Sequence, residues 1–447
     1  MTTGSPLRLL TAFTLPALAG NLLNQVYSIT DSIIVGRYLG QTSLAAIGVT
    51  MPIVLLTAAM VVGLNVGVGI LLSQAFGRKD IEQMRHTFAN SFYLALIIAL
   101  FTMSVGLPLT VPILKLMGTP SAPMAEAASY LHINFATTIF PLLYFLFNNA
   151  FRGMGDSMTA LWCLIVSVVI NIFLDILFVA VFGWGVAGTA WATAIAQALS
   201  VVFSVVMLYR RFPEMHLKRE DFRLDRPLLG AITKLAVPIA VQTGFNNLGN
   251  VVVQSCINGF GEAVMAAYTA ASRVGTLSLM PAETLGSAMS VFAGQNFGAG
   301  KPGRIKKGVK ASWQLNIIVS VLLGAALLIF GKSCIGLFLK DPSPEVATAA
   351  YRFLLFAAVP GILNGIMCIY QQTLRGVGKA TQAVIGGFMQ LGAKVLVALL
   401  GARVFLHLDV VWLAWPISFA AGTVFPFLVY RKMFRGVSDA EPASEAS

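Results

Sequence analysis

Residues 158–182 read MTALWCLIVSVVINIFLDILFVAVF, an almost unbroken apolar run in which Asp175 is the single charged residue. A helix needs about 20 mostly apolar residues to cross the ~30 Å hydrocarbon core of a bilayer. This run is long enough, and similar runs follow one another from the N-terminus to about Tyr430. The pattern therefore predicts a protein that crosses a membrane many times.

The composition of the whole chain agrees with this prediction. Of its 447 residues, 57% are hydrophobic and only 11% are charged, and the mean hydropathy is +0.81. These values exclude an ordinary soluble domain. A net charge of +12 would suggest nucleic acid binding in a soluble protein, but here the basic residues lie in short loops between apolar runs. We therefore expect membrane lipid as a partner and no nucleic acid.

Apolar runs bounded by charged residues, glycine and proline predict twelve transmembrane helices. The expected ranges are 9–35, 43–73, 88–113, 130–150, 158–182, 185–209, 231–258, 264–293, 312–333, 349–373, 380–403 and 408–431. Most basic residues fall in loops on one side of the membrane, among them Arg210, Arg211, Lys301 and Lys306. Because loops rich in Lys and Arg stay in the cytoplasm, both termini are expected there.

Several motifs occur twice along the chain. Phe151–Asp156 returns as Leu374–Lys379, and Ser73–Gly77 returns as Gly294–Gly298. Two further pairs are Leu15–Ala17 with Val237–Ile239 and Gly40–Ala46 with Gly261–Ala267. All four offsets lie between 221 and 223 residues. Matches that keep one offset indicate duplication of a unit of six helices.

An even number of helices in each copy means that both copies enter the membrane in the same direction. The predicted fold is therefore an all-α polytopic membrane protein with two six-helix lobes, related by a pseudo-twofold axis along the membrane normal. We expect an N-terminal lobe at 1–209, a cytoplasmic linker at 210–230, a C-terminal lobe at 231–436 and a disordered tail at 437–447.

Three acidic residues fall well inside the expected helices: Asp31, Asp175 and Glu283. A charged group at mid-membrane costs about 2.5–3.5 kcal/mol on insertion scales, so such a residue usually faces a cavity and serves a function. Asn171 precedes Asp175 by four residues, which places both on one helix face. Two carboxylates surrounded by amide and hydroxyl oxygens suit a shared proton or a sodium ion. The simpler alternative is that each acid only hydrogen-bonds a neighbouring helix.

Two basic residues and a proline inside the expected helices allow more than one interpretation. Lys394 could pair with Glu283, or each could reach central water separately. Arg273 lies nearer a helix end and could extend to the interface. Pro16 removes a backbone hydrogen bond from the helix that carries Asp31, which produces either a movable bend or a static kink.

The remaining patterns favour packing over chemistry. Gly63 and Gly67, at GxxxG spacing, permit close helix packing. The four histidines lie in loops or near helix ends and form no HExxH motif, and the chain has no GxSxG motif. The four cysteines are scattered without CxxC spacing. We therefore expect no enzymatic activity, no cofactor, and a monomer.

Taken together, several of these motifs resemble the multidrug and toxic compound extrusion (MATE) family. The resemblance covers essentially the whole chain. The motifs look most similar to those of the DinF-like prokaryotic branch. It rests on Asp31–Gly36, Leu44–Ala46, Gln74–Gly77, Phe151–Asp156, Asn171–Asp175 and Gly183–Gly188, in this order.

The resemblance implies an antiporter that exports small organic compounds, amphiphilic or cationic, by alternating access in exchange for H⁺ or Na⁺. Such a protein would lie in the plasma (inner) membrane of a prokaryote. The alternative within the same superfamily is a lipid-linked oligosaccharide flippase. A flippase would need a more cationic cavity than Arg273 and Lys394 provide.

The resemblance also implies roles for individual residues. Cation binding would fall to Asp31, Asn171 and Asp175, completed by Asn148 and Thr193, with Tyr27 as a secondary candidate. A sodium ion would be held by Asp31, Asn171, Asp175 and Thr193, and Pro16 would be the bending residue. Another branch of the family uses acids in the C-terminal lobe. Residues 368–372 contain no acid, so no second cation site is expected there.

Overall fold

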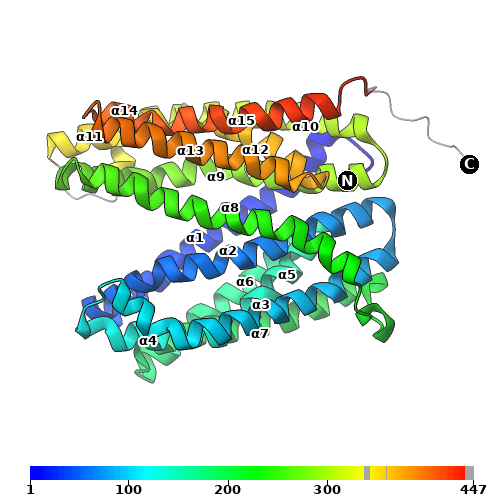
Figure 1. Cartoon of the computed structure of the whole chain (residues 1–447), viewed down its shortest axis with the longest axis horizontal. Helices are drawn as coiled ribbons and strands as arrows, with labels where there is room; N and C mark the ends of the chain where they lie inside the picture. Colours follow the sequence, from blue (N-terminus) through cyan, green and yellow to red (C-terminus); the bar gives the residue numbers. More distant parts are fainter. Residues whose placement is uncertain (337–342, 359, 438–447) are drawn as a thin grey trace, which may run out of the picture. The chain divides into compact units, whose positions relative to one another are not determined.

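The computed structural model describes residues 1–336, 343–358 and 360–437, and every regular element in this part of the chain is a helix (Figure 1). The expected all-α membrane fold is confirmed. Of the tail expected to be disordered, 437–447, only Val437 belongs to the described residues.

The elements up to residue 222 are α1 (Pro6–Tyr38), α2 (Gly40–Arg78), α3 (Ile81–Leu116), α4 (Ser121–Ala136), α5 (Ile139–Gly153), α6 (Ser157–Asp175), the π-helix η1 (Ile176–Val181), α7 (Gly185–Arg211) and the 3-10 helices η2 (Pro213–Met215) and η3 (Arg219–Phe222). The later elements are α8 (Arg226–Asn258), α9 (Glu262–Gly298), α10 (Pro302–Gly336), α11 (Pro344–Ala358), α12 (Pro360–Gly376), α13 (Ala380–Arg403), α14 (Leu408–Trp412) and α15 (Ala414–Met433).

Local signals set where several of these helices begin and end. Asp80 precedes α3, and Asp156 precedes α6. Oδ1 of each aspartate accepts a hydrogen bond of 2.9 Å from the backbone N–H three residues later, which belongs to Gln83 in α3 and to Thr159 in α6. These caps satisfy N–H groups that have no partner within the helix. α2 ends at Arg78, because the next residue, Lys79, has a left-handed φ of 60° that cannot continue a right-handed helix.

The helix expected at 130–150 is broken. α4 and α5 meet there at a bend of 52°. The hydroxyls of Thr137 and Thr138 donate to backbone carbonyls four residues earlier, at 2.7 and 2.8 Å, and thereby compete with the helical hydrogen bonds. Pro141 then contributes no N–H to the first turn of α5. The length and apolar character of 130–150 predicted one continuous helix and did not reveal these two local causes of the break.

Among the described residues, nine helices are long and apolar enough to cross a membrane, and up to eleven spans result when each bent helix pair counts as one. The expected helix at 264–293 falls on α9, which does not belong to that set. α9 carries Arg273 and Glu283 together with several hydroxyl residues, and these lower its hydropathy. The multi-pass architecture is confirmed, and the number twelve stays a prediction.

Contacts divide the chain into two compact units. One consists of Met1–Leu18 and Phe245–Ser447, and the other of Ala19–Gly244. α1 and α8 each contribute residues to both units. The lobes expected at 1–209 and 231–436 are a different division of the chain, and they stay a prediction.

In the unit Ala19–Gly244, the core contains Phe88, Phe147 and Phe151, all essentially buried. The rings of Phe88 and Phe147 meet edge to face, with centroids 5.1 Å apart. Glycine allows α8 to approach α2 closely, because a Cβ atom at Gly63 would lie 2.6 Å from the carbonyl oxygen of Ala236. The packing role expected for Gly63 is therefore confirmed.

In the unit of Met1–Leu18 and Phe245–Ser447, aromatic rings from several helices form one part of the core. Phe353 of α11 packs edge to face on Trp412 and Trp415, with centroids 4.9 and 5.2 Å apart. Arg352 and Asp409 form an ion pair of 2.8 Å beside this cluster. These contacts join α11 to α14 and α15 and hold that end of the unit together.

Candidate ion-coupling site

Asp31 and Asp175 lie near each other in the unit Ala19–Gly244. Asp31 comes from α1 and is half-buried, and Asp175 is the last residue of α6 and is fully buried. The two carboxylates are close enough for the charge of Asp31 to act on Asp175. Two acids that are far apart in the sequence thus form one acidic pair.

A chain of polar side chains extends from Asp175 to α7 and α1. The NH₂ group of Asn171 faces the carboxylate and donates to Oδ2 of Asp175 at 2.8 Å. Its carbonyl oxygen accepts from N and Oγ1 of Thr193, at 3.2 and 3.3 Å. Thr193 Oγ1 also shares a hydrogen bond of 3.3 Å with the hydroxyl of Tyr27. Asn171, Thr193 and Tyr27 therefore connect Asp175 to the helix that carries Asp31.

Each acid keeps one oxygen without a partner. Oδ1 of Asp31 and Oδ1 of Asp175 are buried, and neither has a hydrogen bond to any residue that the structure describes. Buried polar atoms in native proteins are nearly always satisfied, so such exceptions call for an explanation. Binding of a cation or a proton by either acid would give its buried oxygen a partner.

The backbone changes its geometry directly after Asp175. The α-helix becomes the π-helix η1, which runs from Ile176 to Val181. Short π-helical segments occur frequently at functional sites, because the wider turn changes the direction of the side chains that follow. Gly188 of α7 lets the middle of this segment pack closely, since a Cβ atom there would lie 3.2 Å from the Cβ atom of Phe178.

One predicted member of the cluster hydrogen-bonds its own helix, and two nearby polar residues were not predicted. Asn148 is 6% exposed, and its amide donates to the Tyr144 carbonyl at 2.9 Å. Among the described residues it has no hydrogen bond to the acids. Tyr130 of α4 is near enough to feel the charges of both aspartates, and Asn134 donates to its carbonyl at 2.8 Å. The sequence feature that could have indicated Tyr130 and Asn134 is their spacing, since they are two polar residues four positions apart in an apolar run.

The candidates in the other unit do not form a second site of this kind. Lys394 donates to Oδ1 of Asn250 at 2.8 Å, and its Nζ lies 4.8 Å from the ring centroid of Trp415. Within the described parts of the chain, no ion pair joins Lys394 to Glu283. Glu283 and Arg273 both have exposed side chains.

Two further features bear on the predicted roles. α1 runs without interruption through Pro16, from Pro6 to Tyr38. No group of three or more His, Cys, Asp or Glu side chains that could hold a metal ion occurs within 1–336, 343–358 and 360–437. A sodium ion between Asp31 and Asp175 would therefore depend on neutral amide and hydroxyl oxygens.

Comparison with known proteins assigns the chain to a family. The MatE family model matches residues 16–177 and again residues 238–400. The two matches begin 222 residues apart, at 16 and 238, which confirms the internal duplication.

Curated relatives are similar over nearly their whole length. The chain is 31% identical to the probable multidrug resistance protein YoeA of Bacillus subtilis, covering 96% of this chain and 94% of that protein. It is 30% identical to the probable multidrug resistance protein YpnP of the same organism, over 82% and 83% of the two chains. The multidrug export protein MepA of Staphylococcus aureus is 24% identical over 90% and 88%.

Solved structures show the same fold. An outward-facing multidrug resistance MATE family transporter of the MOP superfamily superposes with a TM-score of 0.89, at 22% identity and 96% coverage of both chains. A MOP superfamily transporter from Pyrococcus furiosus, described as having a binding pocket of reverse polarity, superposes with a TM-score of 0.88, also at 22% identity and 96% coverage of both chains. With the double match of the family model, these findings establish that the chain belongs to the MATE family of multidrug efflux transporters and is a multi-pass membrane protein.

Proposed function

We propose that this protein is a secondary exporter that moves small organic compounds out of a prokaryotic cell in exchange for H⁺ or Na⁺. It acts by alternating access, as a monomer in the plasma (inner) membrane with both termini in the cytoplasm, and it needs no cofactor. The observation that carries the proposal is the pair of Asp31 and Asp175, with one buried oxygen on each acid that has no partner among the described residues.

Ion binding by these two acids changes their charge, and the charge decides which arrangement of the helices is stable. Asp31 belongs to α1, and Asp175 is tied to α7 through Asn171 and Thr193. Neutralising one carboxylate removes repulsion between the acids and lets α1 and α6 come together. A unit charge that moves through 100 mV contributes about 2.3 kcal/mol, which is enough to bias a two-state equilibrium.

The arrangement fits a proton better than a sodium ion. Sodium needs several oxygen ligands, and the carbonyl oxygen of Asn171 is already occupied by the two donors of Thr193. A proton needs only the free carboxylate oxygens of Asp31 and Asp175. Two adjacent carboxylates that share one proton titrate as a pair.

The substrate class rests on the relatives. YoeA, YpnP and MepA carry multidrug names, which supports amphiphilic or cationic organic compounds as cargo. The flippase alternative is not favoured, because the cations expected to line its cavity are Arg273 and Lys394 alone, and Lys394 already contacts Asn250 and Trp415.

Purified protein in liposomes tests the proposal. With the native protein, an imposed pH gradient should drive a cationic dye across the membrane in the direction opposite to proton flow. With Asp31→Asn or Asp175→Asn, the pH gradient should no longer drive the dye. Glu262→Gln, which removes an exposed acid at the start of α9, serves as the control and should transport normally. Full gradient-dependent transport in either aspartate variant would refute the site. Transport driven by a sodium gradient alone would replace the proton with sodium.

A further inference from the structure

A pocket of about 520 Å³ lies in the unit of Met1–Leu18 and Phe245–Ser447, between the start of α10 and the end of α15. Four cationic side chains line it: Lys306 of α10, and Arg431, Lys432 and Arg435 at the end of α15. Aromatic rings of Tyr430 and Phe434 line it as well. We propose that this pocket binds the phosphate headgroup of an anionic phospholipid.

The residues that line the pocket supply no negative charge to balance its cations, since none of them is an acid. None of the ion pairs found in the described part of the chain involves Arg431, Lys432 or Arg435. Lys306 donates to the carbonyl of Val437 at 3.0 Å, which holds its ammonium group at the pocket. Arginine binds phosphate through paired N–H donors, so a phosphate group is a fitting counter-ion.

The apolar side of the pocket fits the rest of a lipid. Phe427 and Leu428, one turn before the cations, are 38% and 53% exposed on a helix expected to cross the membrane. The ring of Tyr430 stacks obliquely with Phe434 and Tyr370, with centroids 4.8 and 5.1 Å away. Aromatic residues at the level where an apolar helix ends are typical of the membrane interface. An amphiphile with a phosphate head and acyl chains matches both parts, whereas free phosphate matches only one.

A simpler explanation covers only part of this arrangement. Cations in the last turn of a helix stabilise its dipole, and they also set membrane orientation. Arg431 and Lys432 fit that explanation. Lys306 does not, because it belongs to a helix that begins far earlier in the chain and still faces the same pocket. Basic pockets between transmembrane helices are known to accept phospholipid headgroups.

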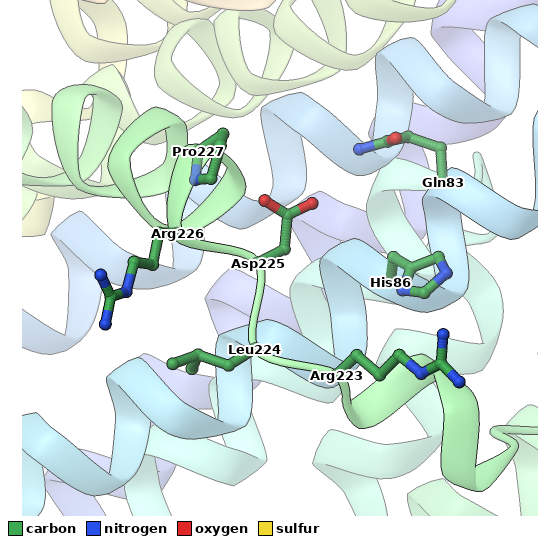
Figure 2. A pocket seen from close by; sticks show the side chains of 7 residues that line it. All are labelled: Gln83, His86, Arg223, Leu224, Asp225, Arg226 and Pro227. Carbon is green, nitrogen blue, oxygen red and sulfur yellow. The ribbon is translucent and has the colours of Figure 1, made fainter.

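A second pocket, in the unit Ala19–Gly244, provides a matched control (Figure 2). It has a volume of about 450 Å³ and includes Arg223 and Arg226 among its lining residues. It also contains Asp225, whose Oδ1 accepts the N–H of Leu228 at 3.0 Å and caps the start of α8. This pocket therefore has its own carboxylate, and its lining has no aromatic ring apart from His86.

The test uses the full-length protein in neutral detergent and native mass spectrometry with added phosphatidylglycerol. Arg431→Gln/Arg435→Gln should lower the affinity for this lipid roughly 25-fold, since each basic residue near a lipid surface contributes about 1 kcal/mol, or about fivefold. The control Arg223→Gln/Arg226→Gln should change it less than threefold. Arg431→Lys/Arg435→Lys keeps the charge and should retain most of the affinity. Thermal unfolding confirms that all variants are folded.

Three results would overturn the proposal. Equal loss of lipid in the two Arg→Gln variants would mean that the basic surface attracts lipid without a site. Protection against unfolding by inorganic phosphate alone, equal to that by phosphatidylglycerol, would identify a phosphate site. Lipid binding seen only after deletion of residues 438–447 would mean that the acidic end of the chain, with Asp439, Glu441 and Glu445, is the occupant.

Discussion

The hydroxyl of Tyr27 on α1 lies 3.3 Å from the hydroxyl of Thr193 on α7. This hydrogen bond joins the helix that carries Asp31 to the residue that fixes the side chain of Asn171, and Asn171 in turn donates to Asp175. A movement of α1 that breaks the bond between Tyr27 and Thr193 would therefore change the surroundings of both acids. The bond therefore connects Asp175 of α6, through Asn171 and Thr193, to α1.

Removing this bond should weaken the connection without unfolding the protein. Tyr27→Phe and Thr193→Val each remove one hydroxyl, and a hydrogen bond of this kind contributes about 0.5–1.5 kcal/mol. The double variant should be destabilised by less than the sum of the single variants, because the second change removes a bond already lost. Unfolding curves for all four proteins measure this coupling. Strict additivity would show that the hydroxyls do not interact.

Asn171 should be more important for stability than Tyr27. Asn171→Ala leaves the buried Oδ2 atom of Asp175 without the amide that donates to it. An unsatisfied buried polar group costs about 1–3 kcal/mol, so the thermal midpoint should fall clearly. Asn149→Ala is the control, because Asn149 neighbours Asn148 on α5 and its amide donates only within its own helix, to Phe145 at 3.0 Å. Equal midpoints for the two variants would contradict the network.

Gly63 should not tolerate a larger residue. In Gly63→Ala the new methyl group would lie 2.6 Å from the Ala236 carbonyl oxygen, which forces α2 and α8 apart. Overpacking of this kind typically costs about 1–3 kcal/mol. Gly48→Ala on the same helix meets no atom within 4 Å, and alanine favours a helix over glycine by about 1 kcal/mol. Unfolding measurements should therefore show opposite signs, and a stable Gly63→Ala protein would contradict the close packing.

Lys394 should be coupled to Asn250 and not to Glu283. The bond from Nζ to Asn250 Oδ1 is 2.8 Å, so a double-mutant cycle of Lys394→Met with Asn250→Ala should give a coupling of about 1 kcal/mol. The corresponding cycle with Glu283→Gln should give less than about 0.5 kcal/mol, as for residues that share no partner. A large coupling between Lys394 and Glu283 would show that they pair in another state of the transporter.

Much of the architecture could be predicted because it depends on short stretches of sequence. Lipid offers no hydrogen bonds to a backbone, so an apolar run such as 158–182 must satisfy its own polar groups as a helix wherever it lies in the chain. The internal duplication, and the positions of Asp31 and Asp175 in apolar helices, are likewise visible in the sequence itself. What each acid does remains a proposal, but its position in an apolar helix followed from the sequence alone.

Other features were decided only in three dimensions. The sequence could not show that the charges of Asp31 and Asp175 reach Tyr130, that Asn148 hydrogen-bonds its own helix, or that Lys394 hydrogen-bonds Asn250 and, within the described residues, forms no ion pair with Glu283. Each depends on which faces of different helices meet, and side-chain volumes at the contacts decide this. The apolar periodicity of one helix contains no such information. The sequence by itself determined the helices and their membrane environment, and tertiary packing decided the polar contacts among them.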